Sequence, residues 1–266
     1  MNSHTNPQFH TTTFSIEAES PWEKRKIKKF DDRVLLPEYA ARKLRFPFGN
    51  TWFRILPAMQ PSKHSWMMGI HSLSYDGGRF THPRTLRPDM KSVFDHAFSW
   101  AKKHYPQSLY GRENKKGVRL LSDTLGLCWC ITQMNGKNVA RLILASGYDS
   151  SRGGDPGIAH RIWSATCRRD EDGNLLHDVI DPLAGRLMCV SKTIPEGAKS
   201  PIFHVSVGKQ PAPIAELMSS MDIEEIKALR PLENTIQQLH EEEEWQALSR
   251  LIAPSTVSLI RDSIKG

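Results

Sequence analysis

Aromatic and basic side chains alternate in residues 51–57, a pattern that suits contact with nucleic acid. Successive side chains of a β-strand point to opposite faces, so Trp52 and Arg54 would share one face of a strand here. An aromatic ring stacks on a nucleobase, worth about 1–3 kcal/mol per base, while a neighbouring guanidinium binds a phosphate. The pattern is also compatible with Trp52 in the core and Arg54 as a surface charge, and the sequence leaves both interpretations open.

Two further segments combine basic and aromatic residues. Across residues 60–87 they interleave with a single acidic residue, Asp76, which favours a finger-like hairpin over a nucleic-acid groove; a charged, solvent-exposed hairpin has the same composition. The second segment surrounds the Gly153-Gly154 turn, where the glycines permit a mobile loop beside a ligand. The predicted nucleic-acid-binding residues from all three segments are Trp52, Arg54, Lys63, Trp66, Tyr75, Arg79, Phe80, Arg84, Tyr148, Arg152, Arg161 and Trp163.

The charge distribution of the chain points to the same class of ligand. The net charge at pH 7 is +7, from 36 Lys and Arg against 29 Asp and Glu. Residues 1–213 carry 31 Lys and Arg against 19 Asp and Glu, whereas residues 214–266 carry 5 against 10. A basic surface attracts polynucleotides because each phosphate contact releases condensed counterions. The sequence therefore predicts a basic binding body followed by an acidic C-terminal segment.

The chain lacks the sequence signatures of common catalytic and cofactor sites. It contains no Walker A, G-x-S-x-G or H-E-x-x-H motif. Its cysteines form no C-x-x-C pair, so we expect them to be reduced and mostly buried: Cys128, Cys130, Cys167 and Cys189. No apolar run reaches 18 residues and residues 1–14 have no apolar signal core. We expect a cytoplasmic, non-enzymatic protein without metal, cofactor or membrane contact.

Hydrophobic periodicity predicts a mainly β fold with helical additions. Strands are expected over residues 51–57, 66–73, 79–81, 125–133, 139–145, 159–168, 187–193 and 202–207. Helices are expected over residues 37–44, 89–105, 214–221, 222–229, 232–252 and 255–265. This order indicates a β-barrel with a helical insertion and a helical C-terminal segment. The predicted parts are a basic N-terminal arm (1–45), a binding core (46–213) and an acidic helical segment (214–266).

Several segments in a fixed order resemble a known family. They begin with the strand Phe53-Arg54-Ile55-Leu56-Pro57, followed by a histidine-bearing strand, a Gly-rich hairpin and a helical insertion. Residues 178–190 then read D-V-I-D-P-L-A-G-R-L-M-C-V, and residues 201–207 read P-I-F-H-V-S-V. In order and spacing, the chain resembles the single-stranded DNA-binding proteins of tailed bacteriophages, the T-even helix-destabilising type, over about residues 50–213.

The resemblance implies an OB-fold barrel that binds single-stranded DNA with little sequence preference and protects it during DNA replication, recombination and repair. It implies that the basic arm, with its lysines and arginine in residues 24–29, promotes self-association along DNA. It also implies that the acidic segment recruits replication or recombination proteins. Several members hold a structural zinc through one histidine and three cysteines in the hairpin region. Every cysteine here lies beyond residue 127, so we expect no zinc.

Two alternatives from other classes stay open at this point. One is an RNA-binding OB-fold protein, which would share the basic and aromatic pattern. The other is a metal-dependent nuclease whose ligands would be His71, His82 and His96, although their spacing matches no established metal motif. A comparison of the affinities for single-stranded DNA and for RNA tests the first alternative. Cleavage of labelled DNA in the presence of divalent metals tests the second.

Overall fold

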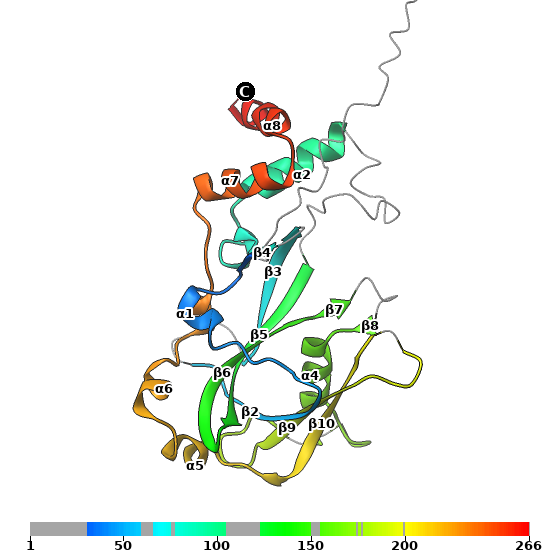
Figure 1. Ribbon diagram of the computed structural model, residues 1–266, viewed down its shortest axis with the longest axis vertical. Helices are drawn as coiled ribbons and strands as arrows, with labels where there is room; N and C mark the ends of the chain where they lie inside the picture. Colours follow the sequence, from blue (N-terminus) through cyan, green and yellow to red (C-terminus); the bar gives the residue numbers. More distant parts are fainter. Residues whose placement is uncertain are drawn as a thin grey trace, which may run out of the picture.

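The computed structural model describes residues 31–59, 66–75, 78–104, 123–149 and 155–265, apart from residues 174, 177 and 199. The strands are β1 (Asp31–Arg33), β2 (Gly49–Ile55), β3 (Met68–Tyr75), β4 (Gly78–Thr81), β5 (Asp123–Met134), β6 (Lys137–Ser146), β7 (Tyr148–Asp149), β8 (Asp155–Pro156), β9 (Arg186–Thr193) and β10 (Ile202–Pro211). The α-helices are α1 (Pro37–Ala40), α2 (Val93–His104), α4 (Ile158–Thr166), α5 (Ile214–Ser219), α6 (Ile223–Lys227), α7 (Glu241–Leu251) and α8 (Pro254–Lys265). Two 3-10 helices are η1 (Pro83–Thr85) and η3 (Leu232–Thr235). Figure 1 shows α2, α7 and α8 gathered at one end of the molecule and the long strands at the other.

Eight strands form one mixed sheet in the order β1-β4-β3-β5-β2-β9-β10, with β6 paired to β5 off this path. Only β1 and β4 are parallel among these pairs. One edge of β5 serves two neighbours, because residues 123–127 pair with β3 and residues 130–132 pair with β2. The predicted mainly β fold with helical additions is confirmed, but the described sheet is not closed into the predicted barrel.

The strands β6, β5, β2, β9 and β10 curve around an apolar core on what we call the inner face. Phe53 of β2 and Met188 of β9 point to this face and are fully buried. Helix α4 packs against β10, β6 and β5 on the same side, with Ala159 and Ile162 in the core. The helix therefore lies between the two outermost strands of this group (Figure 1).

The opposite, outer face of β5 and β6 is covered by segments from both ends of the described chain. Leu127, Trp129 and Ile131 point to this face and are buried in a cluster that includes residues of α1, α5, α6 and η3. Trp129 Nε1 donates to the carbonyl oxygen of Arg230 at 2.8 Å. Glu225 of α6 accepts from Arg42 at 2.8 Å and from Arg141 at 3.2 Å. This cover buries the outer face of β5 from Leu125 to Ile131.

A third apolar cluster lies where the β3-β4 hairpin meets α2, α7 and α8, at the upper end of Figure 1. Phe80 packs against Phe94 with ring centroids 5.1 Å apart. Glu244 of α7 is 3% exposed and accepts the backbone N–H of Val93, the first residue of α2, at 2.9 Å. The same carboxylate accepts a hydrogen bond from Arg87 at 2.9 Å. Part of the acidic C-terminal segment is thereby built into the fold.

The boundaries of the predicted arm and of one predicted helix are wrong. Residues 31–45 are part of the packed structure, because Leu35 is buried and pairs with Ile236 in an isolated antiparallel bridge. Residues 232–252 form η3 and α7 with an extended connection between them. Helix α7 starts at residue 241 because the side chains and backbones of His240 and Glu243 form a capping box.

Residues 159–168 were predicted to form a strand, and this prediction is wrong because they form α4. Ala159, Ile162 and Thr166 are buried, and their spacing of three and four residues gives a helix one apolar face toward the sheet. A short apolar run fits either a strand or a helix, and tertiary packing decides between them. The remaining predicted strands and helices match observed elements with shifts of a few residues at their ends.

His82 gives this part of the fold a pH dependence. Its ring is buried, Nδ1 accepts the backbone N–H of Arg84 at 3.1 Å, and Nε2 lies 3.7 Å from Asp95 Oδ1. Burial lowers the pKa of His82 to about 4, against the attraction of Asp95 and with the repulsion of Arg84 and His71. The unfolded chain therefore binds more protons between pH 6.5 and pH 4, and stability is lost as the pH falls through this window.

We expect the free energy of unfolding to fall by up to about 3 kcal/mol across this pH window. Urea denaturation at a series of pH values, compared between the wild type and His82→Asn, isolates the contribution of the imidazole. The wild type should lose more stability than the variant between pH 6.5 and pH 4. Parallel curves for the two proteins would contradict this assignment.

Candidate nucleic-acid interface

Segments of the chain cover the outer face of β5, whereas the outer face of β2, β9 and β10 is accessible to solvent. Cross-strand pairs place Asn50 beside Ser191 and Ser191 beside His204. The next row on the same face joins Trp52, Cys189 and Ser206. We call these six residues the open face: Asn50, Trp52, Cys189, Ser191, His204 and Ser206. Four of them are exposed, Ser191 is partly buried and Cys189 is 2% exposed, and none of the six is an Asp, Glu, Lys or Arg.

Trp52 is the largest side chain of the open face and is 46% exposed. Its strand is fixed on both sides, because β2 pairs with β5 and β9, and Thr132 Oγ1 donates to the Trp52 carbonyl oxygen at 2.7 Å. The indole lies near Gly208, where an added Cβ would stand 3.6 Å from a ring carbon. Trp52 is therefore outside the core, and its half-exposed ring on a rigid strand is suited to stacking on a base.

The strands that carry the open face contain no acidic residue. The 7, 8 and 10 residues of β2, β9 and β10 include four Lys or Arg and no Asp or Glu. Among the salt bridges of the described residues, none involves Lys192 of β9 or Lys209 of β10. Cations without a carboxylate partner beside a neutral polar face favour an anionic ligand such as a polynucleotide.

Arg54 does not bind phosphate, so its predicted role is wrong. The residue is fully buried, and its guanidinium donates to backbone carbonyl oxygens of four described residues. Nε donates to Ala212 at 3.0 Å, Nη1 donates to Ile55 and Val179, and Nη2 donates to Asp181. Burial also lowers the pKa of this arginine. A side chain with no solvent-exposed surface cannot reach a phosphate, and its role is to hold the chain together.

The loop held by Arg54 is the segment of residues 178–185, so two sequence motifs that we singled out contact each other. Asp181 Oδ1 accepts the backbone N–H groups of Leu183 and Ala184 at 2.8 and 2.6 Å, which lowers the pKa of Asp181. A Cβ at Gly185 would lie 1.9 Å from Arg54 Nη2. Only glycine leaves room for the guanidinium, so the two motifs together form a structural clamp.

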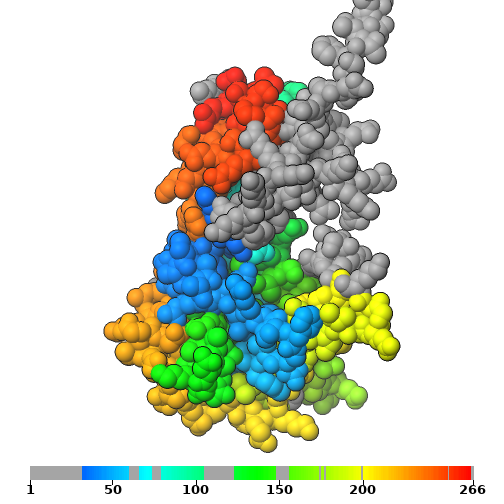
Figure 2. All heavy atoms as spheres, in the orientation of Figure 1, coloured from blue at the N-terminus to red at the C-terminus, as the bar shows by residue number. Residues whose placement is uncertain are grey.

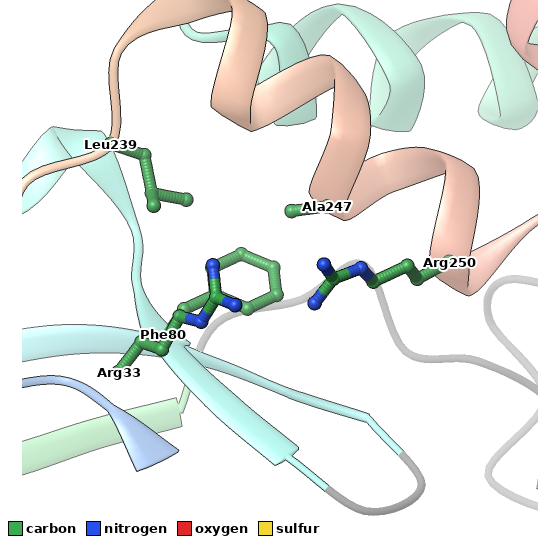
Figure 3. Close-up of a pocket in the computed structure, with 5 residues that line it drawn as sticks. All are labelled: Arg33, Phe80, Leu239, Ala247 and Arg250. Atoms are coloured by element: carbon green, nitrogen blue, oxygen red, sulfur yellow. The ribbon is translucent and has the colours of Figure 1, made fainter. Parts of the chain in front are cut away.

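The predicted cluster in residues 60–87 is dispersed. Phe80 is 2% exposed, so it is a core residue and the prediction that it stacks on bases is wrong. Its ring faces a cavity of about 10 Å³ beneath α7 (Figure 3), lined also by Arg33, Leu239, Ala247 and Arg250. Arg79 and Arg84 each pair with an aspartate, at 2.8 and 2.6 Å. Trp66 is partly buried against the inner-face core.

The third predicted group lies on α4 and the short strands before it. Arg161 Nε donates to the carbonyl oxygen of Pro156 in β8 at 3.0 Å. Trp163 is 49% exposed on the same helix, outside the open face. Lys63 and Arg152 lie outside the described residues, and only the backbone is described for Tyr75 in β3 and Tyr148 in β7. Among the eight predicted residues whose side chains are described, Trp52 alone lies on the open face.

The other five members of the open face were not predicted from the sequence. The alternation of residues 202–207 was an available signal, because it puts His204 and Ser206 on one face of a strand. The pairing of β9 with both β2 and β10 brings Ser191 between Asn50 and His204. No local pattern in the sequence encodes that pairing.

Two structural features bear on the alternatives. Within the described ranges, no three His, Cys, Asp or Glu side chains form a group that could hold a metal ion. No helix in the same part of the chain combines the length and apolar character needed to cross a membrane. Compared with known protein families and with curated proteins, the chain matches none of them.

Proposed function

We propose that the protein binds single-stranded DNA on the open face, without catalysis and with little preference for sequence. The observation that carries this proposal is the half-exposed ring of Trp52, fixed on a strand in a part of the sheet that has no acidic residue. Unpaired bases offer their π-faces for stacking, whereas bases inside a duplex already stack on each other. Stacking tolerates every base, so the expected sequence preference is weak.

The order of the strands supports an OB-fold for the binding core, in agreement with the resemblance to the phage proteins. Along the sheet, β6-β5-β2-β9-β10 corresponds to strands 3-2-1-4-5 of a five-stranded, partly open Greek-key barrel. Helix α4 follows the third of these strands in the chain and precedes the fourth. OB-folds bind oligonucleotides through the outer face of strands 2 and 3 and the adjoining loops. Because helices cover that face here, we assign binding to the neighbouring open face.

Electrostatic contacts supply the second part of the proposed mechanism. Lys192 is next to Ser191 in β9 and points to the opposite, inner face. Lys209 of β10 is exposed and would neutralise a phosphate of a DNA strand that crosses the open face. Each neutralised phosphate of single-stranded DNA changes the slope of log affinity against log salt concentration by about −0.7. The affinity should therefore fall steeply with salt.

Gel shifts with single-stranded DNA, duplex DNA and RNA of equal length, each at two salt concentrations, test the proposal. We expect tighter binding to single-stranded DNA than to duplex, a steep salt dependence, and a slope reduced by about 0.7 in Lys209→Gln. A preference for duplex, or no binding to any polynucleotide, would reject the proposal. Tighter binding to RNA would instead support the RNA-binding alternative.

The proposal extends to partners and location. Self-association along DNA through the basic arm and recruitment of replication or recombination proteins remain proposals from the resemblance, as does action in the cytoplasm of a cell, or of the host cell for a phage protein. Glu225, Glu243 and Glu244 of the C-terminal segment are buried or partly buried and accept hydrogen bonds within the fold. Recruitment would therefore depend on the acidic residues that stay exposed, such as Glu241 and Glu242 in the first turn of α7.

A further inference from the structure

Three side chains gather at the end of the sheet where β2 begins, β9 ends and β10 begins. Strand register pairs Gly49 with Lys192, and Lys192 with Phe203. The Lys192 Nζ lies 4.6 Å from the centroid of the Phe48 ring and 5.7 Å from that of Phe203. We call Phe48, Lys192 and Phe203 the rim cluster. The residues around β2, light blue in Figure 2, and those of the β9-β10 hairpin, yellow, meet at the surface here.

Phe48 is 61% exposed, more than Trp52. Gly49 has a φ of 93°, a left-handed conformation that glycine adopts readily, and it turns the chain just before β2 so that Phe48 reaches Lys192. Ile194 and Ile202, 52% and 39% exposed, flank the hairpin connection between β9 and β10. Exposed apolar side chains gathered at one end of a sheet mark a surface that binds a ligand.

The chemistry of the rim cluster restricts that ligand. The ammonium of Lys192 lies over aromatic rings and takes part in none of the salt bridges of the described residues. A suitable ligand therefore presents a flat apolar surface to Phe48 and a negative charge to Lys192. An unpaired nucleotide carries both groups, the base and the phosphate, at a short separation.

We propose that the rim cluster is a second nucleotide-binding position, with a base stacked on Phe48 and a phosphate bound by Lys192. This inference rests on the proposed function, because it places a second contact on the DNA strand that Trp52 binds. Trp52 lies on the outer face of β2, and Phe48 lies just before the turn at Gly49. Lys192 and Phe203 are each one residue away from a member of the open face, so they point to the opposite, inner face at the end of the sheet. The Cα atoms of Phe48 and Trp52 are at most about 14 Å apart, so one DNA strand that passes around the end of the sheet where β2 begins touches both rings.

The experiment measures the affinity of the full chain for oligothymidylates of increasing length, from about 2 to about 16 nucleotides, the upper site size of a single OB-fold. Phe48→Ala should weaken binding about tenfold for long oligonucleotides and leave the shortest unaffected, since only the longer strands reach from Trp52 to Phe48. Lys192→Gln should reduce the salt slope by about 0.7 for the long oligonucleotides. Ile223→Ala, on α6, is the matched control because Ile223 is also 61% exposed.

The outcomes separate the rim cluster from the open face. Weakening confined to the longer oligonucleotides supports the second position. Equal weakening at every length, or none at any length, overturns it, and thermal unfolding of Phe48→Ala excludes a folding defect as the cause. If Trp52→Ala weakens binding while Phe48→Ala does not, only the rim position is rejected. If the wild type binds no single-stranded DNA, both the rim position and the proposed function fail.

Discussion

Replacing Trp52 with alanine is expected to weaken the binding of single-stranded DNA by about tenfold to one hundredfold. The variant loses the largest accessible ring of the open face, and one stacked base is worth about 1–3 kcal/mol. The loss should be similar for different base compositions, because stacking does not read hydrogen-bond patterns. Fluorescence-anisotropy titrations with labelled homopolymers and a mixed sequence measure it.

Trp163→Ala is the matched control for this prediction. Trp163 is 49% exposed against 46% for Trp52, but it lies on α4 and outside the open face. We expect the control to bind like the wild type and Trp52→Phe to retain part of the affinity, since a smaller ring still stacks. An equal loss in both tryptophan variants, or no loss in Trp52→Ala, would remove the open face from the binding site.

Replacing Arg54 with alanine is expected to lower the free energy of unfolding by about 3–5 kcal/mol. The buried guanidinium donates to the carbonyl oxygens of Val179, Asp181 and Ala212, and all three lose this donor in the variant. A cavity also remains where a large, fully buried side chain stood. Urea denaturation monitored by fluorescence measures the change.

Two further variants test whether the clamp is structural. Gly185→Ala should also destabilise the protein, because its Cβ would overlap the guanidinium. In Arg54→Lys, which keeps a charge but fewer donors, stability should fall while the salt slope of DNA binding in the folded protein stays unchanged. A reduced slope in Arg54→Lys would mean that this side chain contacts phosphate after all. A stability near that of the wild type in Arg54→Ala would contradict the clamp.

Local sequence patterns predicted the hairpins well. The strands β5 and β6 match the predicted runs at 125–133 and 139–145, and the turn between them is Asn135-Gly136. Both turn residues have positive φ, 52° and 77°, as this dipeptide favours in a tight hairpin. The information needed for this part of the fold lies within a few residues, so one sequence suffices.

The candidate site depended on contacts between distant segments, and the sequence predicted little of it. Alternation in β2 correctly put Trp52 and Arg54 on one face, since both lie on the outer face of the sheet. Their side chains differ in exposure because residues 178–185 and Ala212 cover Arg54 but not Trp52. Phe80 shows the same effect, because α7 and α8 arrive from the far end of the chain to bury it.

Base stacking on Trp52 is tested most directly by photo-crosslinking of the wild-type protein to single-stranded DNA that carries 5-iodouracil, followed by mapping of the crosslinked peptide. This reagent reacts with aromatic side chains that lie against the base, so it reports the stacking contact itself. We expect a crosslink at Trp52 that is lost on addition of unlabelled single-stranded DNA and retained on addition of unlabelled duplex. Crosslinks confined to α4, or to any segment away from β2, β9 and β10, would contradict this expectation.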